Sequence, residues 1–133
     1  MIRYGIDTNV LIRFIVQDDP EQSKRATDFL KNHCSEEAPG FISMVVMCEI
    51  VWVLRRAYGY SKSNIINVLE TILRTSELMV EEPQIAWEAL HRFKTGSADF
   101  SDFIIGTIDK SAGCEQTATF DQQAGQSDLF RLI

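Results

Sequence analysis

"GFISMVVMCEIVWVLRR", residues 40–56, contains two structural elements in one stretch of chain. Residues 40–43 are short, apolar and end in a serine, which is typical of a strand that runs into a turn. From about Met44 to Tyr58 the sequence predicts a long apolar helix, with basic residues in its last turn and a glycine just beyond it. A strand that leads directly into such a helix indicates a βα unit.

One glutamate interrupts the apolar surface of this helix. The residues three and four positions from Glu49 are apolar: Val45, Val46, Trp52 and Val53. A buried and unpaired carboxylate costs several kcal/mol or becomes protonated. Two explanations stay open at this point: Glu49 reaches solvent past a poorly packed face, or it belongs to a site.

The rest of the chain alternates between strands and helices. Further strands are predicted at residues 2–6, 78–81, 116–120 and 129–133, and further helices at 8–16, 20–33, 83–94 and 100–113. Another helix is predicted to open at Ser61, with apolar residues through Leu73 on one face. Asp19, Pro20 and Gln22 predict a helix start with a capping box. The alternation implies parallel βαβ units and a sheet covered on both faces, so the expected fold class is α/β, as a single domain of residues 1–133.

Composition limits the kinds of protein that this chain can be. Apolar residues make up 45% and charged residues 24%, the profile of a soluble globular domain, and no stretch approaches the about 20 apolar residues of a membrane span. The three cysteines suit neither a disulfide framework nor a metal motif, so we expect small core residues in a cytoplasmic protein. A net charge of −6 argues against binding nucleic acid through bulk positive charge, but not against a nuclease with a local metal site.

Five carboxylates are predicted to gather at one edge of the sheet. Asp7 ends the first strand, Asp121 ends the fourth, and Glu49 lies within two turns of the end of the second. Asp99 and Asp102 are three positions apart at a helix start, so their side chains point the same way. Ligand sites in parallel sheets lie at the carboxyl ends of the strands. The expected site is therefore acidic.

Such a cluster repels itself unless a cation is bound within it. Mg²⁺ prefers oxygen ligands and is usually held by a few carboxylates together with substrate phosphates. Each acid also has a simpler role open to it: Asp7 as a helix N-cap, Asp99 with Asp102 as a capping pair, and Asp121 as a turn residue. The joint occurrence of all these acids at one predicted edge favours a metal site.

At these residues the chain resembles the PIN-domain family, in particular the VapC toxins of type II toxin–antitoxin pairs. The matching stretches occur in family order: "YGIDTNVLIRFIVQDDPEQ", "ISMVVMCEIVWVL", "SADFSDFIIG" and "ATFDQQA". They run from Tyr4 to Ala124, nearly the whole chain. The resemblance implies a three-layer α/β/α domain with a short, mainly parallel sheet, and an endoribonuclease that depends on Mg²⁺, with Mn²⁺ as a substitute.

The resemblance also assigns roles to individual residues. The four acids of the family map onto Asp7, Glu49, Asp102 and Asp121, and Asp99 resembles an extra acid of some members. Polar positions that orient ligands or water map onto Asn9, Ser43 and Thr119. Beside the resemblance, basic side chains near the expected site are candidate phosphate contacts: Arg13, Arg55 and Arg56. Helix C-terminal capping is the simpler role of the last two.

The partners expected from this resemblance are a VapB-like antitoxin and an RNA substrate. The long apolar helices after Ser43 and Ser61 hold more apolar surface than a small sheet needs to cover, so we also expect a homodimer. No membrane partner is expected, because the chain has no membrane span. Two alternatives remain. A haloacid-dehalogenase-like phosphatase would use Asp7 as nucleophile, but its motif requires an aspartate where this chain has Asn9. A catalytically inactive PIN-like binding module would have no need to keep every acid.

Overall fold

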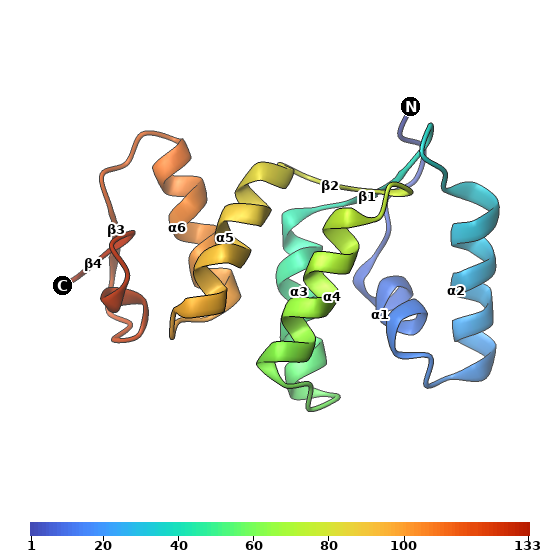
Figure 1. Ribbon diagram of the computed structural model, residues 1–133, viewed down its shortest axis with the longest axis horizontal. Coiled ribbons are helices and arrows are strands. Elements are labelled where there is room, and N and C mark those ends of the chain that lie inside the picture. Colours follow the sequence, from blue (N-terminus) through green and yellow to red (C-terminus); the bar gives the residue numbers. More distant parts are fainter. The chain divides into compact units, whose positions relative to one another are not determined.

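The computed structural model describes residues 1–133, which divide into two compact units, Met1–Glu81 and Glu82–Ile133. Six α-helices and four three-residue strands make up the regular structure, together with one 3₁₀ turn (Figure 1). No helix is long and apolar enough to cross a bilayer. Because each unit has its own contacts, the two are described in turn.

The first unit contains four helices and two strands. In chain order they are α1 (Thr8–Val16), α2 (Pro20–His33), β1 (Gly40–Ile42), α3 (Met44–Arg56), α4 (Lys62–Arg74) and β2 (Leu78–Val80). The strands pair in parallel, and α3 and α4, which lie side by side in Figure 1, form the connection between them. This arrangement confirms the βα unit that the sequence predicts.

The strand predicted at residues 2–6 forms only a single bridge. Gly5 pairs with Phe41 of β1, where the Ile6 N–H donates to the Phe41 carbonyl (2.8 Å) and the Phe41 N–H donates to the Tyr4 carbonyl (2.8 Å). Apolar periodicity correctly indicated an extended segment beside β1. It could not indicate how many residues find a hydrogen-bonding partner.

Helix starts in this unit follow the local chemistry of the sequence. Asp19 accepts a hydrogen bond from the backbone N–H of Gln22 (3.0 Å), and Ser43 accepts one from the N–H of Val46 (3.2 Å). The capping box at Asp19 is only half formed, however. The Gln22 side chain accepts from Arg13 Nε (2.7 Å) instead of returning to the helix start, because a charged donor is the stronger partner.

Helix α3 has one buried and one exposed face. Met47, Ile50 and Leu54 are completely buried, whereas Val45 and Trp52 are 68% and 62% exposed. Trp52 is therefore not a core residue, although its aromatic ring and its apolar neighbours in the sequence predict one. Burial of an apolar helical residue depends on which neighbours cover its face, and periodicity does not identify these neighbours.

The second unit contains α5 (Pro83–Thr95), α6 (Phe100–Ser111), β3 (Thr117–Thr119), the 3₁₀ turn (Ala124–Gln126) and β4 (Phe130–Leu132). β3 and β4 pair in parallel. The rings of Phe93 and Phe100 meet edge to face at 5.8 Å, which joins α5 to α6. Gly106 of α6 lies so close to Leu129 and Phe130 that a Cβ atom there would come within 3.0 Å of both side chains. Glycine thus lets α6 approach β4.

The three cysteines are free thiols in different environments. Cys34 is buried, Cys48 is half-buried, and Cys114 is exposed, so the expectation of a core position is wrong for Cys114. Burial raises the pKa of the Cys48 thiol to about 11. This thiol is therefore protonated at neutral pH and a poor nucleophile.

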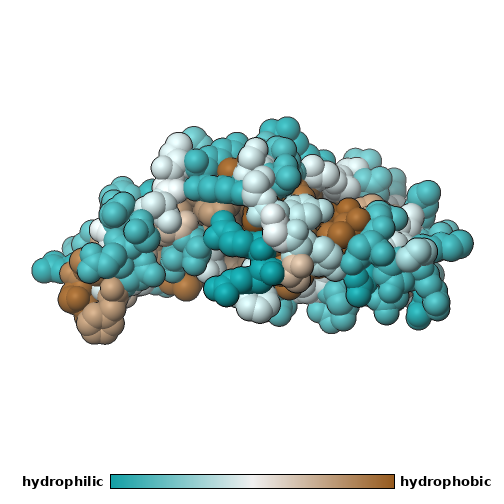
Figure 2. Space-filling model, turned by 90° about the horizontal axis from the view of Figure 1, so that it is seen from below, coloured by the Kyte–Doolittle hydropathy of each residue, from teal (hydrophilic) through white to brown (hydrophobic).

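The surface is mainly polar, with apolar side chains exposed in places. Figure 2 shows apolar atoms in brown at the left of the view, where β3 and β4 lie. Phe120, directly after β3, is 80% exposed. Exposed apolar side chains of this size are candidates for contacts with other molecules when they occur together.

Candidate active site

Two of the predicted acids lie on either side of one threonine in the first unit. Asp7 is the N-cap of α1, and its Oδ1 accepts a hydrogen bond from the backbone N–H of Thr8 (2.7 Å). The hydroxyl of Thr8 donates to Oε1 of Glu49 on α3 (2.8 Å). Thr8 is buried, whereas both carboxylates are exposed. The structure therefore brings Asp7 and Glu49 together and holds them on the surface.

The exposure of Glu49 answers the question that its apolar neighbours raise. Glu49 lies on the face of α3 that carries the exposed Val45 and Trp52, so its carboxylate is not desolvated by the core. The sequence left both a solvent-exposed position and a role in a site open for Glu49, and its exposure is compatible with both. Its accessibility makes it available to a cation or a substrate.

Three acids gather in the second unit. The backbone N–H of Asp99 donates to Oδ2 of Asp102 (3.2 Å), which forms part of a capping box at the start of α6. Burial raises the pKa of Asp102, the hydrogen bond from Asp99 opposes this, and the negative charges of Asp121 and Asp99 raise the pKa further. Asp102 is thus a partly buried carboxyl group beside two other acids, in an environment that disfavours its charged form.

The simpler roles of these acids are also present. Asp121 accepts a hydrogen bond from the backbone N–H of Ala124 (2.8 Å) and so shapes the 3₁₀ turn, as a turn residue does. Thr119 accepts one from the N–H of Asp121 (3.0 Å). Asp7 and the Asp99–Asp102 pair cap helices, as described above. Capping fixes the position of each acid and leaves oxygen lone pairs for another ligand.

Two residues with roles in this arrangement were not found from the sequence. Thr8 connects the acids of the first unit, and Glu81, at the end of β2, accepts a hydrogen bond from the N–H of Met44 (3.0 Å) at the start of α3. The position of Glu81 after a predicted strand was an available signal. Thr8 had none, because its partner Glu49 is distant in sequence. Ser43 caps the same helix start, and Asn9 is exposed in the first turn of α1.

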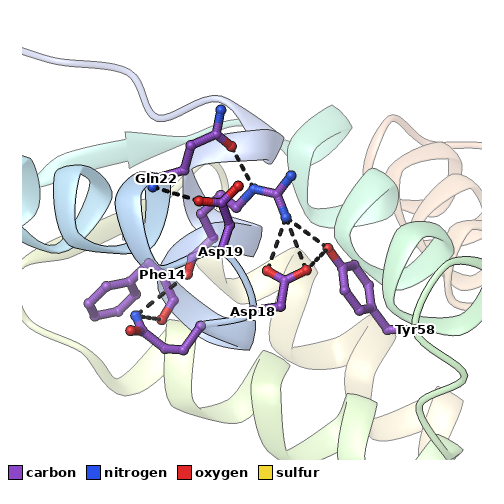
Figure 3. Close-up of polar contacts among 7 residues, drawn as sticks. Phe14, Asp18, Asp19, Gln22 and Tyr58 are labelled. Carbon is purple, nitrogen blue, oxygen red and sulfur yellow. Dashed lines mark hydrogen bonds and ion pairs between the residues drawn. The ribbon is translucent and has the colours of Figure 1, made fainter.

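Arg13, a candidate phosphate contact, belongs to a network at the other end of α1. Figure 3 labels its partners Asp18, Gln22 and Tyr58. Its Nη1 donates to both oxygens of Asp18 (3.0 and 3.1 Å) and to the hydroxyl of Tyr58 (3.1 Å), and its Nε donates to Gln22. Tyr58 in turn donates to Asp18 (2.9 Å). This group, called the Arg13 cluster below, joins α1 and α2 to the segment after α3.

Arg55 and Arg56, the other two candidate phosphate contacts, are exposed in the last turn of α3. The guanidinium of Arg56 lies over the ring of Trp52, 5.9 Å from its centroid. Positions 49, 52 and 56 fall on one face of the helix. The structure therefore places Arg56 on the same side of α3 as Glu49.

The donor atoms of these acids suit a hard divalent cation. All are carboxylate oxygens, the ligands that Mg²⁺ and Mn²⁺ prefer, and the repulsion around Asp102 is of the kind that a cation relieves. Neither unit by itself brings three or more acid, histidine or cysteine side chains together in an arrangement that could hold a metal ion. Asp7 and Glu49 belong to the first unit, and Asp99, Asp102 and Asp121 belong to the second.

Comparisons with known proteins agree with the resemblance described from the motifs. A VapC ribonuclease from Aquifex aeolicus (strain VF5) is 24% identical to this chain over 118 residues, which cover 89% of the chain and 87% of the relative. The model of the PIN domain family matches residues 4–128, including all five acids. With helices alternating with short parallel strands and a match across nearly its whole length, the chain belongs to the PIN domain family and has the α/β/α fold of that family.

Proposed function

We propose that this protein is a metal-dependent endoribonuclease that hydrolyses RNA phosphodiester bonds. The observation that carries the proposal is the grouping of accessible acids. Asp7 and Glu49 share Thr8, and Asp102 is held beside Asp99 and Asp121. All five acids lie within residues 4–128, the stretch that matches the PIN domain family. The similarity to a protein named VapC ribonuclease supports RNA as the substrate.

In this proposal Asp7, Glu49, Asp102 and Asp121 are the catalytic acids, and Asp99 is a further metal ligand. The metal would be Mg²⁺, or Mn²⁺ in its place, held by these carboxylates. When bound, it supplies positive charge that offsets the negative charge developing on the phosphoryl oxygens. We also propose that the two units act as one domain of residues 1–133, because the family match extends over both.

Side chains and backbone groups of the protein itself hold the proposed catalytic acids in position. Thr8 fixes the carboxylate of Glu49 through its hydroxyl and that of Asp7 through its backbone N–H. Thr119 and the 3₁₀ turn hold Asp121. Asn9 and Ser43 lie at the starts of the two helices that carry the acids of the first unit, and we propose that they orient ligands or water.

Phosphate groups of the RNA would contact arginines. We propose Arg55 and Arg56 for this role because both are exposed and Arg56 shares the helix face of Glu49. Arg13 is a further proposed contact. It would have to exchange Asp18 for a phosphate oxygen, since Asp18 and Tyr58 already occupy its Nη1.

The proposed biological role is that of the toxin in a VapBC-type toxin–antitoxin pair in the cytoplasm, where the free cysteines would stay reduced. Its partners would be a VapB-like antitoxin and a second copy of the chain. An antitoxin would present a basic side chain, such as arginine, to the exposed acids. Production of the toxin alone should then stop growth, and co-production of the antitoxin should restore it.

The direct test is RNA cleavage with a defined metal supply. We expect cleavage with Mg²⁺ or Mn²⁺ and none in excess EDTA, because all proposed ligands are oxygen atoms. Asp102→Asn, purified in parallel, controls for contaminating nucleases and should be inactive. Cleavage that persists in EDTA would contradict the proposal. A folded wild-type protein that binds RNA and never cuts it would instead indicate an inactive binding module.

A further inference from the structure

Trp52 is an exposed aromatic residue beside a proposed catalytic acid. The residue is 62% exposed, although tryptophan is usually highly buried. It follows Glu49 by three positions, so both side chains lie on one face of α3, about 4.5 Å apart along the helix axis. A flat apolar surface therefore lies one turn from the carboxylate that Thr8 holds in place.

Arg56 adds positive charge to this surface. Its guanidinium lies 5.9 Å from the centroid of the Trp52 ring, which is the geometry of a cation–π contact. Because the whole chain carries a net charge of −6, general attraction does not bring RNA to the protein. Recognition has to rely on local groups of this kind.

We propose that Trp52 and Arg56 form a stacking site for an unpaired nucleobase of the RNA, next to the phosphodiester that is cut. This inference rests on the proposed function. The base stacks on the indole ring, and Arg56 contacts an adjacent phosphate. Aromatic rings and arginine planes are the groups on which proteins stack unpaired RNA bases. The site thereby selects single-stranded RNA over duplex RNA, whose bases are already stacked.

Tryptophan fluorescence provides a direct measurement of this contact. The chain has two tryptophans, so Trp87→Phe leaves Trp52 as the only reporter. This protein is titrated in EDTA, where no cleavage is expected, with a short mixed-sequence single-stranded oligoribonucleotide and with a duplex of the same length. We expect saturable quenching by the single strand and little by the duplex.

Substitutions separate stacking from charge. Trp52→Ala should weaken binding of the single strand roughly 5- to 150-fold without changing its salt dependence, and Trp52→Phe should keep most of the affinity. Arg56→Gln should reduce the slope of log K against log salt by about 1. Trp87→Phe, which changes the tryptophan of the second unit, should bind like the wild type. Circular dichroism checks that each variant is folded.

Two results would overturn the stacking site. One is unchanged binding by folded Trp52→Ala. The other is a Trp52 ring that acrylamide quenches only after the protein is diluted. This result would mean that a second copy of the chain covers the ring at higher concentration. If Trp52→Ala does not fold, Trp52→Phe and the quenching titration decide. Base stacking on Trp52 without RNA cleavage in Mg²⁺ would overturn only the proposed nuclease function. Cleavage that is unchanged by substitution of Trp52 would overturn only the stacking site.

Discussion

At the scale of single residues, the position of Glu49 is set by one hydroxyl group. The Thr8 side chain donates to its Oε1, and the Thr8 N–H donates to Asp7, so one residue orients two acids. Both acids are exposed. Substitutions at Glu49 can therefore test function without removing core packing.

We expect Glu49→Gln to leave the fold intact and to impair metal binding and cleavage. The amide oxygen can still accept the Thr8 hydrogen bond, while the loss of charge relieves repulsion, so the metal-free protein should be as stable or more stable. The rise in melting temperature on adding Mg²⁺ should shrink. Cleavage should fall by about 100-fold or more, about 2.7 kcal/mol on the barrier.

The measurement combines thermal unfolding with and without Mg²⁺ and single-turnover RNA cleavage. Glu36→Gln, which removes the charge of another exposed glutamate in the same unit, is the matched control and should behave like the wild type. Full activity of Glu49→Gln with an unchanged effect of Mg²⁺ would show that Glu49 is not a metal ligand.

Asp102 gives a prediction for the pH dependence of stability. Its pKa is raised in the folded protein, by burial first and then by the charges of Asp121 and Asp99. Ionised Asp102 therefore lowers the free energy of unfolding, and this loss appears as pH rises from about 4 through the raised pKa. In EDTA, the stability of Asp102→Asn relative to the wild type should increase over that range.

The check is urea unfolding of both proteins between pH 4 and 7. Asp128→Asn serves as a flat control over this range, because a hydrogen bond from Arg92 lowers the pKa of Asp128. The contribution of ionised Asp128 to stability is fully present above the ordinary pKa of an aspartate, about 4, and is lost only below it, so the stability difference between Asp128→Asn and the wild type should stay constant from about pH 4 to 7. The stability difference between Asp102→Asn and the wild type could instead stay constant with pH. That result would show that the charge of Asp102 does not destabilise the folded protein.

At the scale of elements, the Arg13 cluster joins the helices that carry the acids of the first unit. Arg13 belongs to α1, which begins at the Asp7 cap, and Tyr58 follows α3, which carries Glu49. Burial alone would raise the pKa of Asp18, but hydrogen bonds from Tyr58 and Arg13 outweigh it and the pKa is lowered. The cluster is thus a charged connection between α1 and α3.

We expect Tyr58→Phe to weaken this connection and to lower the midpoint of urea unfolding at neutral pH. Ionised Asp18 contributes to the stability of the fold above the ordinary pKa of an aspartate. This contribution is lost as pH falls through the lowered pKa of Asp18. The difference between Tyr58→Phe and the wild type should therefore shrink below about pH 4. Tyr60→Phe, which changes a tyrosine outside the cluster, should have little effect at either pH.

At the scale of the whole molecule, the prediction concerns self-association. Ile105 and Ile108 of α6 are three positions apart and 48% and 40% exposed, which forms an apolar strip on one helix. We expect a two-fold dimer at micromolar concentration in light scattering, with Ile105→Glu shifted toward monomer. A monodisperse wild-type monomer would contradict this prediction. Acrylamide should still reach Trp52 in the dimer.

The sequence by itself determined where the helices lie and where they start, and which residues are acidic at the ends of elements. All six helices occur where the sequence predicts them, starting at caps such as Asp19, Ser43 and Ser61. These features depend on hydrogen bonds between residues within three or four positions, so the local pattern contains the information. The acid positions that end strands and begin helices follow for the same reason.

Only the tertiary structure decided which faces are covered and which side chains meet. Glu49 and Trp52 lie in an apolar sequence and yet are exposed, Thr8 contacts Glu49, and Arg13 contacts Tyr58. Each of these facts depends on elements that are distant in the chain. Burial and long-range hydrogen bonds arise from packing between elements, and the periodicity of one helix cannot show what packs against it.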